Sequence, residues 1–361
     1  MRDLVPYRKF AVGYTTKVVF ADLIRPYLAT ISEVFFSWPG MVSGRTLNYS
    51  GNIESEKKRL LEDLSWCKQH NIKLDLLFNG NCYGDDCFSE KLRAQVYDVI
   101  DQLSQNGLMP EVITTTSQFI AKCIKVKYPE IDIRASVNMR LESTKAMEFV
   151  SDLFDSFYIC RDLQRDLTIL ELFSKWCKKK NKKLCMLANS ACLRCCPVQT
   201  FHDNFLCHGA EKIHEQVYLL RFPFRLCERH FQDQKNSVDY LRMSWIRPED
   251  LHCYEPFVST IKLATRDIDH PDLVLNAYCH GAYDGNVLDY LGIEDHFVYL
   301  DNKSFPEDWM NDKIAQSCAI NCNECGKCSS ILNIVQKQGR ETGPSYSFSD
   351  AFLKTQTDLK I

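Results

Sequence analysis

Short apolar stretches and helical stretches alternate along most of this chain, and this alternation constrains the fold more than any other feature. Apolar stretches typical of strands occupy 10–14, 31–37, 73–80, 111–116, 132–138, 155–160, 182–188 and 259–265. Segments with helical periodicity separate most of them, at 22–29, 54–71, 89–106, 117–128, 143–153 and 167–180. About eight strand–helix repeats over roughly 260 residues are typical of a (β/α)8 barrel.

A doubly wound open sheet is the structural alternative to a barrel. No GxGxxG follows the first strand, so nothing specific supports a dinucleotide-binding fold. We expect a TIM-like barrel over 1–270 and a C-terminal extension over 271–361. The loops NCYGDDC and NSACLRCC both follow predicted strands, and in such barrels the functional groups lie at the carboxyl ends of the strands.

Composition excludes several classes of protein. The net charge is −3, and no block of basic residues suggests a polyelectrolyte grip on nucleic acid. The N-terminal sequence MRDLVPYRKFAVGY has neither the apolar core nor the cleavage site of a signal peptide. No apolar run reaches the roughly 18 residues that a membrane span needs. We therefore expect a cytoplasmic protein.

The chain contains 18 cysteines, far above average usage. Without a signal peptide, thiolate ligation of a metal is favoured over disulfides. Some cysteines stand alone in the sequence, and an isolated cysteine often behaves as a small core residue. We expect this role for Cys67, Cys123, Cys160, Cys177 and Cys279.

The first cysteine constellation lies in the loop after the seventh predicted strand. Cys192 and Cys196 are its preferred metal ligands, with Cys185, Cys195 and Cys207 nearby. Soft sulfur selects zinc or iron–sulfur clusters. The loop alone does not complete a ligand set, and the candidates for the remaining ligands are Cys227 and Cys253, or the C-terminal cysteines if these fold back to the loop. A set of buried free thiols is the alternative interpretation.

A second constellation, SCAINCNECGKCSS, lies in the predicted extension. It contains Cys318, Cys322, Cys325 and Cys328 within eleven positions, with small and polar residues between them. The spacing is similar to that of ferredoxins, in reversed order, and this favours a second iron–sulfur cluster slightly. A structural zinc ion is the rival, because four thiolates satisfy tetrahedral zinc equally well.

Three further residues are candidate catalytic groups. Lys262 and Arg266 lie in IKLATR, where strand alternation can direct Lys262 into the barrel mouth to bind a carboxylate or phosphate. Ordinary surface ion pairing is the alternative for both. His202 follows the first cysteine loop and is a candidate ligand or general acid, although a hydrogen bond to the metal's ligands is the simpler role.

Two segments and one cysteine spacing resemble a known family. The spacing Cys185-x6-Cys192 at the end of a strand resembles the C-x6-C of the collagenase-like proteins of peptidase family U32. IRPEDLHCY followed by IKLATR resembles that family's SPKDLC and LKIEGR segments, with Ala264 and Thr265 replacing the Glu-Gly of the second. The resemblance covers about Phe10 to Asp267, and the family's barrel agrees with the alternation of strands and helices.

The resemblance implies chemistry as well as a fold. Several U32 members are iron–sulfur proteins, among them oxygen-independent hydroxylases of quinone precursors and of RNA bases, in which four cysteines hold one 4Fe–4S cluster. Carried onto this chain, Cys192 and Cys196 are the best ligands, Cys227 is the next, and Cys253 matches the cysteine of the DLC segment. The second constellation lies outside the family's common core.

Three functions therefore compete. The leading one is an iron–sulfur hydroxylase or related oxidoreductase acting on a small molecule, an RNA base or a peptide, with an electron donor as a partner protein. A U32-type peptidase is the second, although the sequence contains no recognisable nucleophile or catalytic zinc motif. A non-catalytic binding partner stabilised by zinc or clusters is the third.

Overall fold

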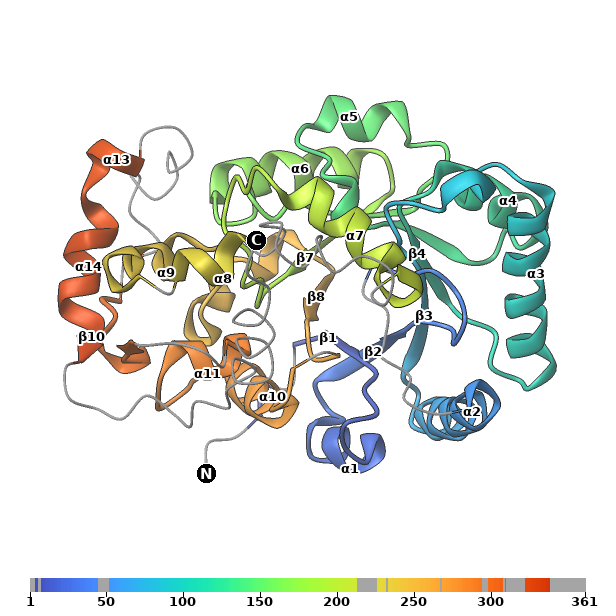
Figure 1. Cartoon of the computed structure of the whole chain (residues 1–361), viewed down its shortest axis with the longest axis horizontal. Helices are drawn as coiled ribbons and strands as arrows, with labels where there is room; N and C mark the ends of the chain where they lie inside the picture. The colour runs from blue at the N-terminus through green and yellow to red at the C-terminus, as the bar shows by residue number, and fades with distance from the viewer. Residues whose placement is uncertain are drawn as a thin grey trace, which may run out of the picture.

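Eight parallel strands close into one barrel in chain order, with β8 paired to β1 (Figure 1). The computed structural model describes residues 4–5, 8–44, 52–212, 226–231, 233–266, 268–293, 298–307, 309 and 322–337. The predicted (β/α)8 barrel is thus confirmed. Its strands are β1 (Phe10–Gly13), β2 (Ile31–Phe36), β3 (Lys73–Phe78), β4 (Val112–Thr115), β5 (Asp132–Ala135), β6 (Ser156–Tyr158), β7 (Lys183–Leu187) and β8 (Thr260–Leu263).

The helices between the strands form the outer layer. Five of them begin at a residue whose side chain accepts a backbone N–H of the first turn: Asn52, Ser89, Ser117, Ser143 and Asp166. Such caps satisfy donors that the helix itself leaves unpaired. The helices of this layer are α1 (Phe20–Ile24), α2 (Ile53–Gln69), α3 (Glu90–Gln105), α4 (Gln118–Lys127), α5 (Thr144–Phe149) and α6 (Leu167–Lys179).

The connection from β7 to β8 is longer than the others, as the sequence predicts. It begins with the cysteine loop and α7, and it ends with short helices outside the barrel strands. Among these, η6 packs against α10 (Pro271–His280), which itself packs against α1. The elements of the connection are α7 (Gln199–Lys212), α8 (Leu226–Phe231), η5 (Gln234–Asn236), α9 (Val238–Arg242), η6 (Pro248–Cys253) and η7 (Glu255–Phe257).

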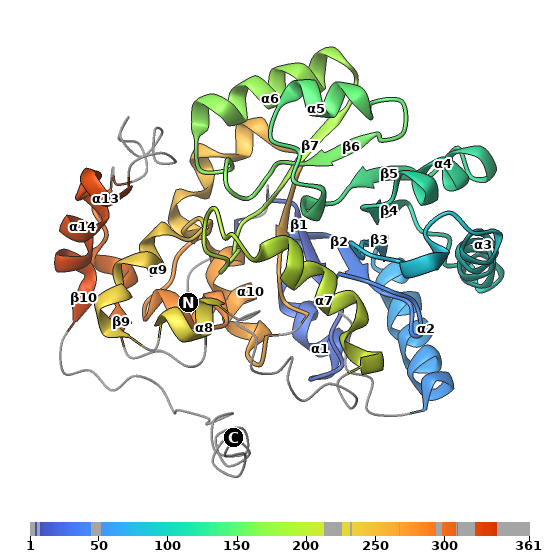
Figure 2. The same cartoon turned by 45° about the horizontal axis from the view of Figure 1, so that its top comes forward.

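The C-terminal elements gather on the side of the molecule away from α3 (Figures 1 and 2). Helix α14 packs against α9 and η8, and β9 pairs with β10 in a small antiparallel sheet. The predicted boundary after residue 270 stays a prediction, and α10 continues the barrel's helical layer beyond it. The elements are α11 (Val287–Leu291), β9 (Tyr299–Leu300), η8 (Asn302–Ser304), α13 (Cys322–Cys325), α14 (Lys327–Val335) and β10 (Gln336–Lys337).

No helix in the described ranges is both long and apolar enough to span a bilayer. The isolated cysteines are confirmed as core residues, because Cys67, Cys123, Cys160, Cys177 and Cys279 are all buried.

The two faces of the barrel strands differ in chemistry. The outward-facing side chains, such as Val34, Leu76 and Ile133, belong to one continuous apolar core beneath the helices. Among the described residues, three inward-facing apolar side chains form a separate small cluster: Ala11, Phe35 and Leu77. Charged and hydroxyl side chains occupy much of the remaining interior, and this interior positions the candidate site.

Candidate active site

An ion pair crosses the interior of the barrel. Arg134 lies on β5 and Glu33 lies on β2, with two strands between them around the barrel, so their contact passes through the lumen. Arg134 Nη2 donates to Glu33 Oε2 at 3.0 Å, and Nη1 donates to the other carboxylate oxygen. Both side chains are buried. A buried bidentate contact of this kind is a charge-assisted pair with fixed geometry.

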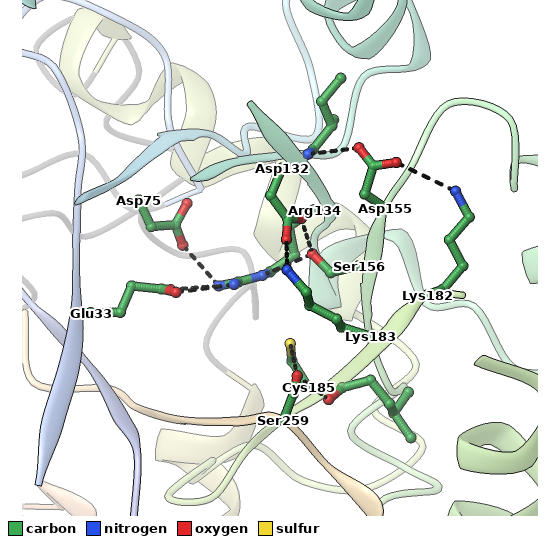
Figure 3. A network of polar contacts seen from close by, with 12 residues as sticks. Glu33, Asp75, Asp132, Arg134, Asp155, Ser156, Lys182, Lys183, Cys185 and Ser259 are labelled. Carbon is green, nitrogen blue, oxygen red and sulfur yellow. Dashed lines mark hydrogen bonds and ion pairs between the residues drawn. The ribbon is translucent and has the colours of Figure 1, made fainter. Parts of the chain in front are cut away.

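The Arg134 guanidinium is also held from the amino ends of the strands (Figure 3). Its Nε donates to Ser156 Oγ at 3.2 Å, and Ser156 Oγ donates to Asp132 Oδ1 at 2.6 Å. Lys183 Nζ donates to Asp132 Oδ2 at 2.6 Å. The guanidinium therefore has one preferred position, which is set by residues of β2, β5, β6 and β7.

Asp75 on β3 is the second carboxylate of the interior. Thr114 Oγ1 donates to its Oδ2 at 2.9 Å, and Arg134 Nη1 lies 3.5 Å from the same oxygen. The Oδ1 atom is buried and has no hydrogen-bond partner among the described residues. Burial raises the pKa of Asp75 to about 7, with Arg134 opposing and Glu33 adding to the shift. This carboxyl can hold or release a proton near neutral pH.

Lys262 on β8 extends into the same interior. Its Nζ lies 3.7 Å from the centroid of the Phe35 ring and 5.5 Å from that of Tyr158. Burial lowers the pKa of Lys262 to about 8, with Asp75 opposing and Arg266 adding to the shift. Lys262 and Asp75 thus have pKa values displaced toward each other, a pattern found at functional sites.

The loop after β8 is fixed at the barrel mouth. Thr265 Oγ1 accepts the Gly13 N–H at 2.8 Å and donates to the Gly13 carbonyl at 3.1 Å. Asn189 Nδ2 donates to the Ala264 carbonyl at 2.9 Å. These bonds hold the next residue, Arg266, with its side chain buried beside the mouth. The two predicted cations, Lys262 and Arg266, therefore belong to one site.

Helix α7 lies across the mouth (Figure 2). Arg161, from the loop after β6, donates to Cys192 Sγ at 3.3 Å and pairs with Asp203 of α7 at 3.8 Å. Asn81, from the loop after β3, donates its backbone N–H to Cys207 Sγ of α7 at 3.1 Å. The helix is thus attached to loops that follow β3, β6 and β7.

The predicted ligands of the first cluster are spread over several elements. Cys192 and Cys196 lie in the loop before α7, partly exposed. Cys227 lies in α8. Burial raises the pKa of Tyr240 of α9, and the nearby Cys227 adds to the shift. Cys253 lies at the end of η6, outside the barrel strands, with its Sγ 3.4 Å from His252 Nε2. Cys192 and Cys253 therefore lie in different parts of the connection from β7 to β8.

The second set of predicted ligands lies partly beyond what can be described. Cys318 and the side chain of Cys322 fall outside the described residues, whereas Cys325 and Cys328 lie in α13 and α14. Within the described ranges, no three Cys, His, Asp or Glu side chains are arranged to hold one metal ion. The ligand sets stay predictions. His202 lies on α7, next to Asp203 at the mouth.

Three interior residues were missed in the sequence: Glu33, Asp75 and Arg134. Each is a charged residue within a strand that also contains outward-facing apolar residues, in ISEVFF, KLDLLF and DIRA. Because strand neighbours face opposite sides, a charge between outward-facing apolar residues must face the lumen. The alternation of side chains along each strand could therefore have identified these three residues as facing the lumen.

A closed parallel barrel with a charged interior, beneath loops at the carboxyl ends of its strands, defines a TIM-type barrel with an enzyme-like site. Known proteins agree with this architecture. The chain is 25% identical over 311 residues to "Uncharacterized protease MJ1657" of Methanocaldococcus jannaschii, covering 83% of this chain and 87% of that protein.

A solved structure, that of the U32 peptidase Mk0906, has the same fold. It is 13% identical and superposes with a TM-score of 0.51 over 72% of this chain and 93% of that one. No family model matches the chain. The two likenesses confirm the resemblance to peptidase family U32 that the motifs predicted.

Proposed function

We propose that this chain is an iron–sulfur enzyme of the U32 type that modifies a substrate at the barrel mouth, by oxygen-independent hydroxylation or a related reaction. The observation that carries the enzymatic part is the buried pair of Lys262 and Asp75, with pKa values of about 8 and about 7. A buried amine and carboxyl displaced in this way cost stability, and they are typical of groups that exchange protons.

The interior residues have distinct roles in this proposal. Asp75 takes up or releases a proton through the oxygen that has no described hydrogen-bond partner. Lys262 is the second proton-exchanging group. Arg266 binds a negatively charged group of the substrate, because a buried guanidinium favours carboxylates and phosphates. The Arg134 side chain is buried, so its role is to hold the two carboxylates in position.

The iron–sulfur part rests on the cysteines. Cys192 and Cys196 lie beside the mouth with partly exposed side chains, and soft thiolates suit such a cluster. The described residues do not fit a complete ligand set, because no third ligand joins these two cysteines. A complete cluster would therefore require further ligands from segments outside the described ranges.

Metal analysis of the protein purified without oxygen tests the proposal. We expect iron and acid-labile sulfide together, an electron paramagnetic resonance signal after reduction, and loss of iron in Cys192→Ser. The matched control is Cys87→Ser, a partly exposed cysteine of the loop after β3 that is no ligand candidate. Zinc alone, without a redox signal, would contradict the proposal and support a metal-stabilised binding protein.

A peptidase is the second candidate, because the similar proteins are named as a protease and a U32 peptidase. Casein cleavage by the purified chain, unaffected by iron chelation and lost in Asp75→Asn, would favour it over the hydroxylase. Absence of cleavage with a full complement of iron would exclude it.

A further inference from the structure

The amine of Lys262 has an environment that suits covalent chemistry as well as proton exchange. We propose that Lys262 is a nucleophile that forms an imine with an aldehyde or ketone carbon of a substrate bound at the barrel mouth. The inference rests on the proposed function only in placing the substrate at this site. Neither similar protein's name implies a carbonyl-binding lysine.

The surroundings of the Nζ atom carry the inference. Lys262 makes no hydrogen bond or ion pair through Nζ to any described residue, although two carboxylates lie in the same interior. Instead, the nitrogen lies over the face of Phe35, with the Tyr158 ring nearby. A nitrogen that is not occupied by a carboxylate keeps its lone pair available once it loses a proton.

The Phe35 ring fits in this place because the neighbouring residue of β1, Gly13, has no side chain. A side-chain carbon at Gly13 would lie 2.8 Å from two carbons of the ring, closer than real contacts allow. Gly13 therefore lets the ring lie against β1, beneath the amine. Replacing it would move the aromatic surface on which the nitrogen rests.

The titratable groups that face Lys262 are Asp75, Glu33, Arg134, Arg266 and Tyr158. Burial lowers the pKa of Lys262 most, and the two arginines add to this, whereas Asp75 and Glu33 raise it. Burial also raises the pKa of Tyr158, so its hydroxyl stays neutral. At pH ~7.5 an amine of pKa about 8 is roughly one quarter neutral, about two hundred times the fraction of an amine at 10.5.

The chemistry balances with groups already present. The Nζ lone pair forms the C–N bond while the carbonyl π electrons move to oxygen, and a proton passes from nitrogen to that oxygen. The Asp75 carboxyl, with a pKa of about 7, protonates the resulting hydroxyl, and the C–O bond breaks to release water. The product is a protonated imine, and no oxidant or reductant is consumed.

Reductive trapping tests the inference. The full chain is incubated with pyruvate or with propionaldehyde and sodium cyanoborohydride, and the modified lysine is located by peptide mass spectrometry. We expect Lys262 to be modified with at least one probe, about two hundredfold faster than exposed lysines, as its neutral fraction implies. Modification spread equally over exposed lysines, or none at Lys262 with either probe, would overturn the inference.

Two variants sharpen the test. Lys262→Met should lose the adduct, whereas Lys73→Met, which removes the exposed first residue of β3, should retain it. Asp75→Asn should slow adduct formation while melting cooperatively. Should Lys262→Met fail to fold, the wild-type peptide map still decides. Trapping is measured on iron-containing and iron-depleted protein alike, so its failure is distinguishable from absence of the cluster.

Discussion

The two faces of the same barrel strands show opposite ways of using buried area. On β3, Leu74 and Leu76 face outward and join the continuous apolar core, whereas Asp75 between them faces the lumen. Burying an apolar side chain stabilises the fold by about 1.5–3 kcal/mol. Burying a charge costs several kcal/mol unless partners offset it. The outer face therefore stabilises the barrel, and the inner face retains groups that stability alone would not favour.

The largest expected effect comes from removing the interior cation. Arg134→Met leaves Glu33 and Asp75 buried without their guanidinium, so the free energy of unfolding should fall by about 3–5 kcal/mol. Urea denaturation followed by circular dichroism measures this.

A compensated variant separates charge from shape in that experiment. Combining Arg134→Met with Glu33→Gln and Asp75→Asn removes all three charges and should restore most of the lost stability. A triple variant no more stable than Arg134→Met alone would mean that the interior depends on the shape of the arginine rather than on charge.

The outer face should respond through packing. Leu76→Ala, at a fully buried outward-facing position, should lower the free energy of unfolding by roughly 3 kcal/mol through lost burial and a cavity. The same urea titration measures it, and the loss should be independent of pH between about 5 and 8. A pH-dependent loss would show that the two faces are coupled.

The inner face, by contrast, should make stability depend on pH. The pKa of Asp75 is about 7 in the folded chain and about 4 when unfolded, so the folded state binds more protons between these values. Stability contributed by this group is present below pH ~4 and is lost as the pH rises toward 7. Thermal melting of wild type against Asp75→Asn measures the difference, which should vanish at the acidic end.

The smallest effect should come from the rim of the charged interior. Lys183 pairs with Asp132, but its side chain is 59% exposed. Lys183→Met should therefore change the free energy of unfolding by less than about 1 kcal/mol. A loss approaching that of Arg134→Met would show that the charged group extends to the surface of the barrel.

Much of the fold could be predicted because strand and helix periods are local properties. The stretch predicted at 73–80 became Lys73–Phe78, and that at 167–180 became Leu167–Lys179. The strand ends differ from the predicted ones by at most three residues, because each strand ends where its pairing with a neighbouring strand stops. The helix predicted at 22–29 is α1 followed by the 3-10 turn Arg25–Tyr27, because Pro26 removes a helical donor.

The site could be predicted only in part, because its residues meet through the lumen. Lys262 and Arg266 were predicted because both lie in IKLATR, where strand alternation can direct Lys262 into the barrel mouth. Arg134 and Glu33 are 101 positions apart, and no local pattern brings them together. Cys253 was grouped with Cys192 from the motif, although a connection that passes outside the barrel strands separates them.

Arg161 couples the binding of a ligand at Cys192 to the position of α7 at the barrel mouth. One guanidinium donates to Cys192 and pairs with Asp203 of α7. Any ligand that binds the Cys192 sulfur competes with Arg161 and alters what holds the helix over the barrel. By reciprocity, a substrate that displaces α7 changes the affinity of that sulfur for its ligand by the same factor. Access to the barrel and occupancy of the thiol are thus one coupled equilibrium.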